Sequence, residues 1–245
     1  MILSPECDPM GRAIEDHYTL GRAQHKLVVK SEQFDDDEMP VGELFRDECV
    51  MPPLERLALQ RCQGHVLDVG AAAGRHTLAL EARGLQVTSI DVSLLSTQVR
   101  KQRGAKDARC ADFFEDDFGT SFDTIILLMN GLGIAGTLDR LPRLLHRCQE
   151  LLAEGGRILA DSTDLRYVFE DEDGVLDWDA ADGYYGEVDY RMEYGTCRGE
   201  RFGWLYVDFD TLRIAAASCG LEAECIGEGK HYDYLAEIKV KQGGE

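Results

Sequence analysis

One segment, residues 65–91, constrains the fold more than any other part of this 245-residue chain. An apolar run at 66–69 leads into a turn of small residues that ends at Gly74, and a helix-like stretch then leads to a second apolar run that ends on Asp91. This pattern predicts a strand, a turn, a helix and a second strand. The turn presents backbone N–H groups at the start of a helix, and Asp91 can accept hydrogen bonds from ribose hydroxyls. The unit therefore predicts a site for a nucleoside cofactor.

The turn differs from the fingerprint of nicotinamide dinucleotide sites, which carries glycine at its first, third and sixth positions. In this chain those positions hold Gly70, Ala72 and Arg75. An arginine side chain where helix and strand must pack closely argues against a dinucleotide. A buried strand–helix–strand unit with an incidental acid at its end is the alternative to a cofactor site.

The pattern Asp68-x-Gly70-x-Ala72-x-Gly74 resembles motif I of the class I S-adenosylmethionine-dependent methyltransferases, and Asp91 matches the acid after that family's second strand. The resemblance implies an α/β fold with a doubly wound, mostly parallel seven-stranded sheet (a Rossmann-like methyltransferase fold) whose last strand is antiparallel. It also implies S-adenosyl-L-methionine as the cofactor. The cofactor-binding residues that it implies are Asp68, Gly70, Ala71, Ala72, Gly74, His76, Asp91, Val92, Asp112, Phe113, Met129, Asn130 and Gly131.

Later segments continue the resemblance. A short third strand ends on Asp112, followed by Phe113, and in the family an acid and an apolar residue at this place contact the adenine; a strand end beside an acidic loop is the alternative. The run 122–129 is apolar without alternation, which predicts a strand buried on both faces. It leads to residues 130–131, where the family's backbone carbonyls receive the ammonium of the cofactor. The segment 151–159, with two adjacent glycines, resembles the family's leucine-rich turn into strand five.

The last part of the chain gives a second test of the resemblance. The pattern predicts a helix over 209–219 that ends at Gly220, followed by strands at 221–226 and 234–240. A helix followed by a β-hairpin is how methyltransferases complete their sheet, whereas a plain dinucleotide-binding domain does not end in this way.

An insertion separates strand five from the last helix. It holds an acidic loop at 170–182, an alternating strand at 188–194 and a returning strand at 202–209, which together predict an inserted β-hairpin over the carboxyl edge of the sheet. This segment is also rich in aromatic residues. Aromatic side chains with acids nearby could hold a cation or a planar substrate, or could form a small hydrophobic core. The aromatic residues of this segment are Tyr184, Tyr185, Tyr190, Tyr194, Phe202, Trp204 and Tyr206.

The domain organisation follows from these segments. We expect residues 1–48, which are acidic and contain Gly and Pro, to be irregular. Residues 1–50 are predicted to be an N-terminal extension and a candidate active-site lid, by analogy with small-molecule methyltransferases. Residues 51–245 are predicted to be the methyltransferase domain, with its substrate-side insertion at 164–208.

Charge and cysteine content narrow the partners. The chain has 26 basic and 46 acidic residues, a formal net charge of −20, so nucleic acid and anionic membrane are not expected as partners. A cationic substrate would suit this charge, although acidity also serves solubility. The eight cysteines show no zinc-finger spacing, so no structural metal is predicted, and they are typical of reduced core residues in a cytoplasmic protein.

The reaction implied by the resemblance is an in-line displacement of a methyl group from a sulfonium. The enzyme must hold the nucleophile, methyl carbon and sulfur in line and exclude water. A nucleophile that carries a proton could also need a base. The candidate catalytic residues are His231, Asp161 and Tyr185, although a histidine in a Gly-Lys-His-Tyr loop could equally be a surface residue.

Three functions remain open from the sequence. The first is methyl transfer to a small-molecule acceptor. The second is aminopropyl transfer on the same fold, which lacks support because Asn130-Gly131 stands where a paired aspartate motif is expected. The third is a non-catalytic regulator that binds the cofactor. A methyltransferase acting on nucleic acid is disfavoured by charge, and one acting on protein is neither supported nor excluded.

Overall fold

A seven-stranded sheet forms the centre of the molecule, with strands in the order β10-β11-β7-β6-β3-β4-β5. The computed structural model describes residues 1–169 and 183–241, so the acidic loop predicted at 170–182 lies outside the described residues. The strands of this sheet are β3 (His65–Val69), β4 (Gln86–Asp91), β5 (Asp107–Cys110), β6 (Phe122–Leu127), β7 (Leu152–Thr163), β10 (Leu221–Glu228) and β11 (Asp233–Val240).

The directions of these strands match the expected topology. The five adjacent strands β7, β6, β3, β4 and β5 run parallel to one another. Strand β11 runs antiparallel to both of its neighbours, β7 and β10. The predicted doubly wound sheet with an antiparallel last strand is confirmed. One detail differs, because β7 begins at Leu152 rather than after the glycines, and Gly155 lies within it at φ +73°.

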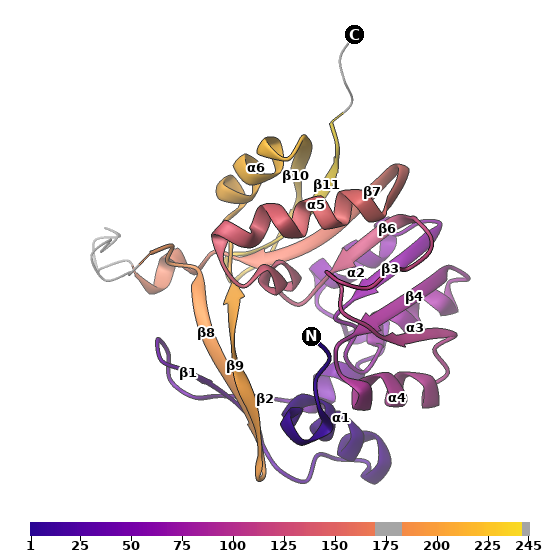
Figure 1. The fold of residues 1–245 in the computed structure, drawn as a ribbon, viewed down its shortest axis with the longest axis vertical. Helices are drawn as coiled ribbons and strands as arrows, with labels where there is room; N and C mark the ends of the chain where they lie inside the picture. The colour runs from indigo at the N-terminus through magenta and orange to yellow at the C-terminus, as the bar shows by residue number, and fades with distance from the viewer. Residues whose placement is uncertain (170–182, 242–245) are drawn as a thin grey trace.

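Helices cover both faces of this sheet (Figure 1). One core cluster joins α5 and α6 to the sheet, and a second joins α2 and α3 to it. The helices are α1 (Pro9–Leu20), α2 (Pro53–Arg61), α3 (Arg75–Ala82), α4 (Leu94–Gln102), α5 (Leu141–Leu151) and α6 (Phe209–Ser218). The short 3₁₀ turns are η1 (Pro5–Cys7), η2 (Val41–Phe45), η3 (Glu48–Val50), η4 (Gly131–Ala135), η5 (Leu138–Arg140) and η6 (Leu165–Val168). No helix in the described ranges is long and apolar enough to cross a membrane.

The first 48 residues are ordered, so the expectation of irregular structure was wrong. Helix α1 begins after Asp8, whose carboxylate accepts a hydrogen bond from the Gly11 N–H at 2.8 Å, and Pro9 occupies its first position. Ala13 and Ile14 are fully buried. Asp8 and Pro9 are thus the start signals of this helix.

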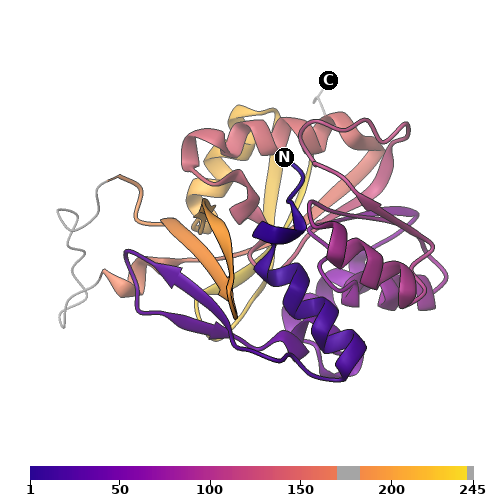
Figure 2. The ribbon, with the colours of Figure 1, turned by 60° about the horizontal axis from the view of Figure 1, so that its bottom comes forward.

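A second sheet, in the order β2-β1-β8-β9, packs beside the first (Figure 2). The inserted hairpin is confirmed as β8 (Glu187–Tyr194) and β9 (Cys197–Leu205). The returning strand begins earlier than predicted, because the chain reverses at Gly195, which has a φ of +57°. The hairpin is not isolated, since β1 (Leu27–Ser31) pairs with β8 and β2 (Asp37–Met39) pairs with β1.

Candidate functional site

The turn between β3 and α3 is built for close approach to its main chain. Gly70 and Gly74 have φ of +71° and +85°, and Ala72 has a φ of +44°. A Cβ atom at Gly74 would lie 2.9 Å from Cγ of Arg100, so this position combines a left-handed backbone with close packing. Asp68, at the end of β3, is buried and accepts a hydrogen bond from the Thr77 hydroxyl at 2.6 Å, which fixes the start of α3 against the strand.

Asp91 ties this turn to the end of β4. Its carboxylate accepts hydrogen bonds from the Ala72 N–H at 2.9 Å and from the Ser93 N–H at 2.8 Å. Each carboxylate oxygen has a second lone pair, so the group keeps acceptor capacity for a ligand hydroxyl. The next residue, Val92, accepts the Leu3 N–H at 2.9 Å through its carbonyl oxygen, which brings the start of the chain to the same place.

The side chain of Arg100 contacts the turn from helix α4. The sequence did not predict this role, because Arg100 lies among the polar residues of the predicted helix. Its side chain is fully buried in α4. It donates to the Ala72 carbonyl at 2.9 Å, to the Thr97 hydroxyl at 2.9 Å and to the Arg109 carbonyl at 3.2 Å. Burial lowers the pKa of the Arg100 guanidinium. The Asp91 carboxylate, whose Oδ2 lies 3.7 Å from Nη1 of Arg100, opposes part of this decrease.

A buried charge cluster flanks the turn on its other side. Nη2 of Arg75 lies 2.6 Å from Oε1 of Glu55, and Nε2 of His76 lies 2.7 Å from Oε2 of the same carboxylate. Arg75 also donates to the Glu43 carbonyl at 2.8 Å. The arginine that argued against a dinucleotide therefore lies beside an acid from α2 that the sequence did not reveal as its partner. Burial lowers the pKa of Arg75, and Glu55 counteracts this.

A small pocket opens between these groups. Small residues of the turn form one wall, and the Arg75 and His76 side chains stand at its edge. This arrangement suits a ligand that lies close to the main chain, because the turn allows close contact. The Arg75 guanidinium and the His76 ring on this side are already bound to Glu55. The lining residues are Leu44, Asp68, Val69, Gly70, Ala71, Ala72, Arg75, His76, Leu128 and Met129.

The end of β6 has an unusual backbone. Met129 and Asn130 both have positive φ, +66° and +57°. Asp161 on β7 holds this conformation, because its carboxylate accepts the Met129 N–H at 3.1 Å and the Gly131 N–H at 3.2 Å. The Thr163 hydroxyl donates to Oδ1 of Asn130 at 2.8 Å. Burial of the Asp161 carboxylate away from water raises its pKa to about 6, although the hydrogen bonds from the two backbone N–H groups act in the opposite direction.

The remaining predicted residues lie in different surroundings. Asp112 accepts the Phe114 N–H at 2.9 Å and lies past the end of β5. The Phe113 side chain is buried within the main core cluster. His231 is exposed in the turn between β10 and β11, where its N–H donates to Asp233 at 3.0 Å.

Tyr185 is buried before the start of β8. Its hydroxyl lies 2.9 Å from Oδ1 of Asp164 and 3.2 Å from Oδ2 of Asp208, and burial raises its pKa. A hydroxyl flanked by two carboxylates keeps its proton and acts as a donor. The three candidate catalytic residues therefore occupy separate places: Asp161 at the β6 tip, Tyr185 under the second sheet and His231 on an exposed turn.

One face of the second sheet adjoins the tip of β6, and we call it the inner face. A Cβ atom at Gly133 would lie 2.0 Å from Nε1 of Trp204, so the indole lies directly on η4. Met192 of β8 shares an apolar cluster with Met129 and Ala72. Met192 thus brings the inner face close to the turn between β3 and α3.

Comparisons with known proteins identify relatives of this chain. The family described as a methyltransferase domain matches residues 66–156. A crystal structure of a SAM-dependent methyltransferase from Bacteroides fragilis, in complex with S-adenosyl-L-homocysteine, is 51% identical, with a TM-score of 0.93 over 99% of this chain and 98% of that chain. A comparison with curated proteins gives no match.

More distant structures share the fold. The CcbJ methyltransferase from Streptomyces caelestis is 16% identical, with a TM-score of 0.59 over 80% of this chain and 98% of that chain. CalS10, an amino pentose methyltransferase from Micromonospora echinaspora, is 16% identical, with a TM-score of 0.54 over 84% of this chain and 99% of that chain.

Proposed function

Because this chain belongs to the S-adenosylmethionine-dependent methyltransferases, we propose that it transfers the methyl group of S-adenosyl-L-methionine to a small-molecule acceptor. The observation that carries the cofactor assignment is the relative crystallised with S-adenosyl-L-homocysteine, which is 51% identical over 99% of this chain. The small acceptor is supported by the second sheet, which covers the β6 tip with half-buried aromatic side chains.

The cofactor roles that we propose follow the contacts around the turn. Asp91 accepts the ribose hydroxyls on the lone pairs that Ala72 and Ser93 leave free. Arg75 and His76 stand where they can bind the carboxylate of the amino-acid end. Asp112 serves the adenine, and Phe113 supports this end from the core.

When bound, the cofactor supplies an electrophilic methyl group on a sulfonium. The task of the chain is then to align the acceptor and exclude water, which can contribute several kcal/mol to catalysis. In our proposal Asp161 fixes the left-handed backbone of Met129 and Asn130, and Trp204 closes the acceptor side. Tyr185 is a hydrogen-bond donor that orders this side, and His231 remains the candidate base nearest to solvent.

Residues 1–50 are proposed to act as a lid over the cofactor. Their contacts with the cofactor-binding elements come from three separate points of the segment. The Leu3 N–H donates to Val92, Asp8 accepts from the Ser93 hydroxyl, and the side chain of Leu44 lines the pocket. Release of the product would then require this segment to move.

We also propose a cytoplasmic location. All eight cysteines are free thiols, including buried Cys148 and Cys219, and this is expected of a protein kept in a reducing compartment.

Titration calorimetry of the purified protein with S-adenosyl-L-methionine and S-adenosyl-L-homocysteine tests the proposal. Micromolar binding that an Asp91→Ala substitution abolishes is the expected result. Binding of NAD in place of both ligands would contradict it. A radiolabelled methyl-transfer screen of small acceptors, with S-adenosyl-L-homocysteine release as the readout, then tests catalysis.

A further inference from the structure

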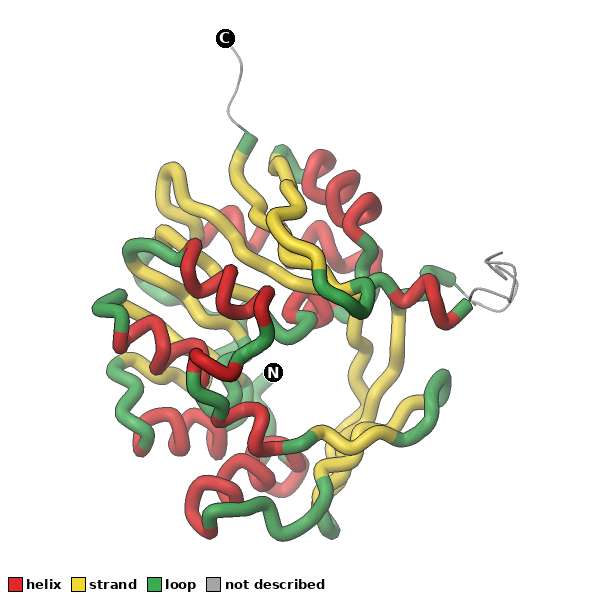
Figure 3. Tube along the Cα trace, turned by 180° about the vertical axis from the view of Figure 1, so that it is seen from behind, coloured by secondary structure: helices red, strands yellow, loops and turns green. Residues whose placement is uncertain are grey.

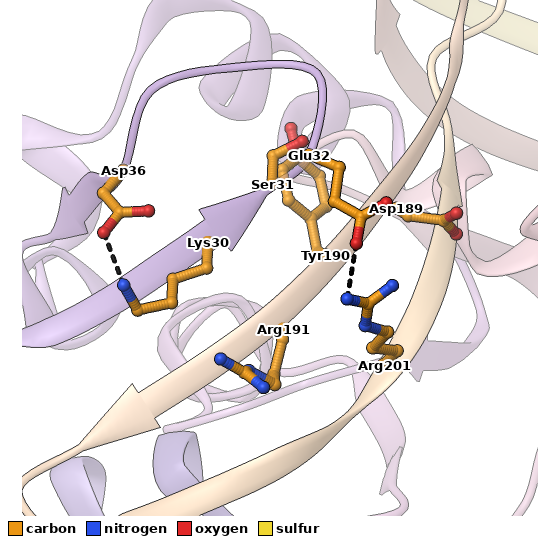
Figure 4. A pocket seen from close by; sticks show the side chains of 8 residues that line it. All are labelled: Lys30, Ser31, Glu32, Asp36, Asp189, Tyr190, Arg191 and Arg201. Carbon is orange, nitrogen blue, oxygen red and sulfur yellow. Dashed lines mark hydrogen bonds and ion pairs between the residues drawn. The ribbon is translucent and has the colours of Figure 1, made fainter.

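The two faces of the second sheet carry opposite chemistry. The cross-strand register places Lys30, Arg191 and Arg201 side by side on the face opposite to Tyr190 and Met192, here called the outer face. Figure 4 shows Lys30 paired with Asp36 and Arg201 paired with Glu32, and Arg191 pairs with Glu193. The cations of the outer face are therefore held by acids.

The inner face has a different composition. At the paired positions of the sheet, this face holds neither lysine nor arginine, and its one charged side chain is Asp37. Asp37 is assigned to this face because it pairs with Val29, one residue away from the outer-face Lys30. The residues at these positions are Leu27, Val29, Ser31, Asp37, Met39, Val188, Tyr190, Met192, Tyr194, Cys197, Phe202 and Trp204.

Two tyrosine hydroxyls are hydrogen-bonded to each other near this face. The hydroxyls of Tyr190 and Tyr206 lie 3.1 Å apart, and both side chains are half-buried. Burial raises the pKa of both phenols, and the negative charge of Asp37 contributes to each rise. Asp37 is exposed, and one of its carboxylate oxygens accepts the Glu38 N–H at 2.8 Å, which leaves the other oxygen accessible.

The inner face favours the binding of a cation over the binding of an anion. An ammonium group is attracted both by a carboxylate and by the faces of aromatic rings. A carboxylate or phosphate would be repelled by Asp37 and would meet no cation at the paired positions of this face. The formal net charge of −20 acts in the same direction over longer distances.

We infer that the methyl acceptor is a small organic amine, protonated at neutral pH, whose apolar or aromatic body lies on the inner face and whose ammonium group is recognised by Asp37 on that face. A protonated nitrogen has no lone pair, so the ammonium group serves recognition, and the methyl group passes to an acceptor atom that keeps its lone pair, with S-adenosyl-L-homocysteine as the leaving group. The inference rests on the proposed function, because it concerns the acceptor side of the same site. It follows from the contrast between the two faces of one sheet rather than from overall acidity.

Three probes that share one ring separate charge from shape. Tyramine, 4-hydroxyphenethyl alcohol and 4-hydroxyphenylacetate carry a cation, no charge and an anion on similar side chains. Each would be titrated calorimetrically into the full-length protein saturated with S-adenosyl-L-homocysteine. We expect tyramine to bind about tenfold more tightly than either of the others.

The neighbouring acids provide a matched pair of variants. Asp37→Asn should remove most of the preference for tyramine, whereas Asp36→Asn, with the same change in net charge, should keep it because Asp36 is paired with Lys30. Both positions are exposed, so neither change is expected to alter folding, which the circular dichroism spectrum checks.

The outcomes separate the two proposals. Absence of S-adenosyl-L-homocysteine binding would refute the proposed function. Binding of that ligand together with equal affinity for the three probes, or with no binding of any probe, would overturn only the amine inference. Equal losses in the Asp36 and Asp37 variants would also overturn it, because the preference would then come from bulk charge.

Discussion

Replacement of Arg100 by methionine tests how far the cofactor-binding turn depends on one buried cation. Methionine fills similar space but removes the hydrogen bonds that Arg100 donates to the carbonyl oxygens of Ala72 and Arg109, at about 1 kcal/mol each. It also removes the charge 3.7 Å from Asp91, an attraction of about 4 kcal/mol at an effective dielectric constant of about 20. The variant no longer has to dehydrate a guanidinium, which offsets part of this loss. We expect a net destabilisation of about 3 kcal/mol.

Urea denaturation followed by circular dichroism measures this change, and calorimetry with S-adenosyl-L-homocysteine measures its effect on the turn. Affinity should fall by at least about tenfold, because Ala72 and Asp91 lose a common partner. Lys101→Met, at the exposed next position of α4, is the matched control and should change neither quantity. A loss below about 1 kcal/mol with unchanged affinity would refute the reasoning.

Three further changes test other contacts. Gly74→Ala should cost about 2 kcal/mol more than Gly84→Ala, which has nearly the same φ but no atom within 4 Å, and equal urea midpoints would exclude the crowding by Arg100. Ser93→Ala should cost about 2 kcal/mol in thermal or urea unfolding, because it removes the cap of α4 and the partner of buried Asp8; a loss of a few tenths would contradict this. The pKa of Asp161 is raised in the fold, so its carboxyl favours folding below its unfolded pKa and loses this as pH rises through about 6. Between pH 7.5 and 4 the wild type should therefore gain about 2.5 kcal/mol relative to Asp161→Asn, and a pH-independent difference would contradict the assignment.

Local sequence patterns were sufficient where both partners of a contact lie close in the chain. The unit from β3 to β4 and the apolar strand β6 could be predicted because their burial repeats over a few residues. Strand β1 could not, because its partner β8 lies about 160 residues later and no local pattern encodes that pairing. Strand β2 pairs only with β1, so it was missed together with β1.

The site shows the same limit at the level of side chains. Small residues and an acid at strand ends identified the turn and Asp91, because the backbone there dictates residue type. Arg100 and Glu55 were missed, since a charged residue on a helix is ordinarily solvated, and only packing reveals that both are buried against the turn. Asp161 was identified as a candidate base, and the contacts now show it as an acceptor of backbone N–H groups.

The second sheet joins strands from two distant parts of the chain, β1–β2 near its start and β8–β9 late in it (Figure 3). During synthesis, β1 can pair with β2 at once, but its other partner β8 emerges only after most strands of the main sheet have been made. Closure of such a long loop is slow and costs chain entropy, so we expect the second sheet to form last in folding. The pairing of β1 with β8 also couples the two segments in evolution. If residues 184–206 alone were exchanged, β1 would have to pair with a strand of different sequence. A change of acceptor through this sheet therefore requires matched changes in two segments about 160 residues apart.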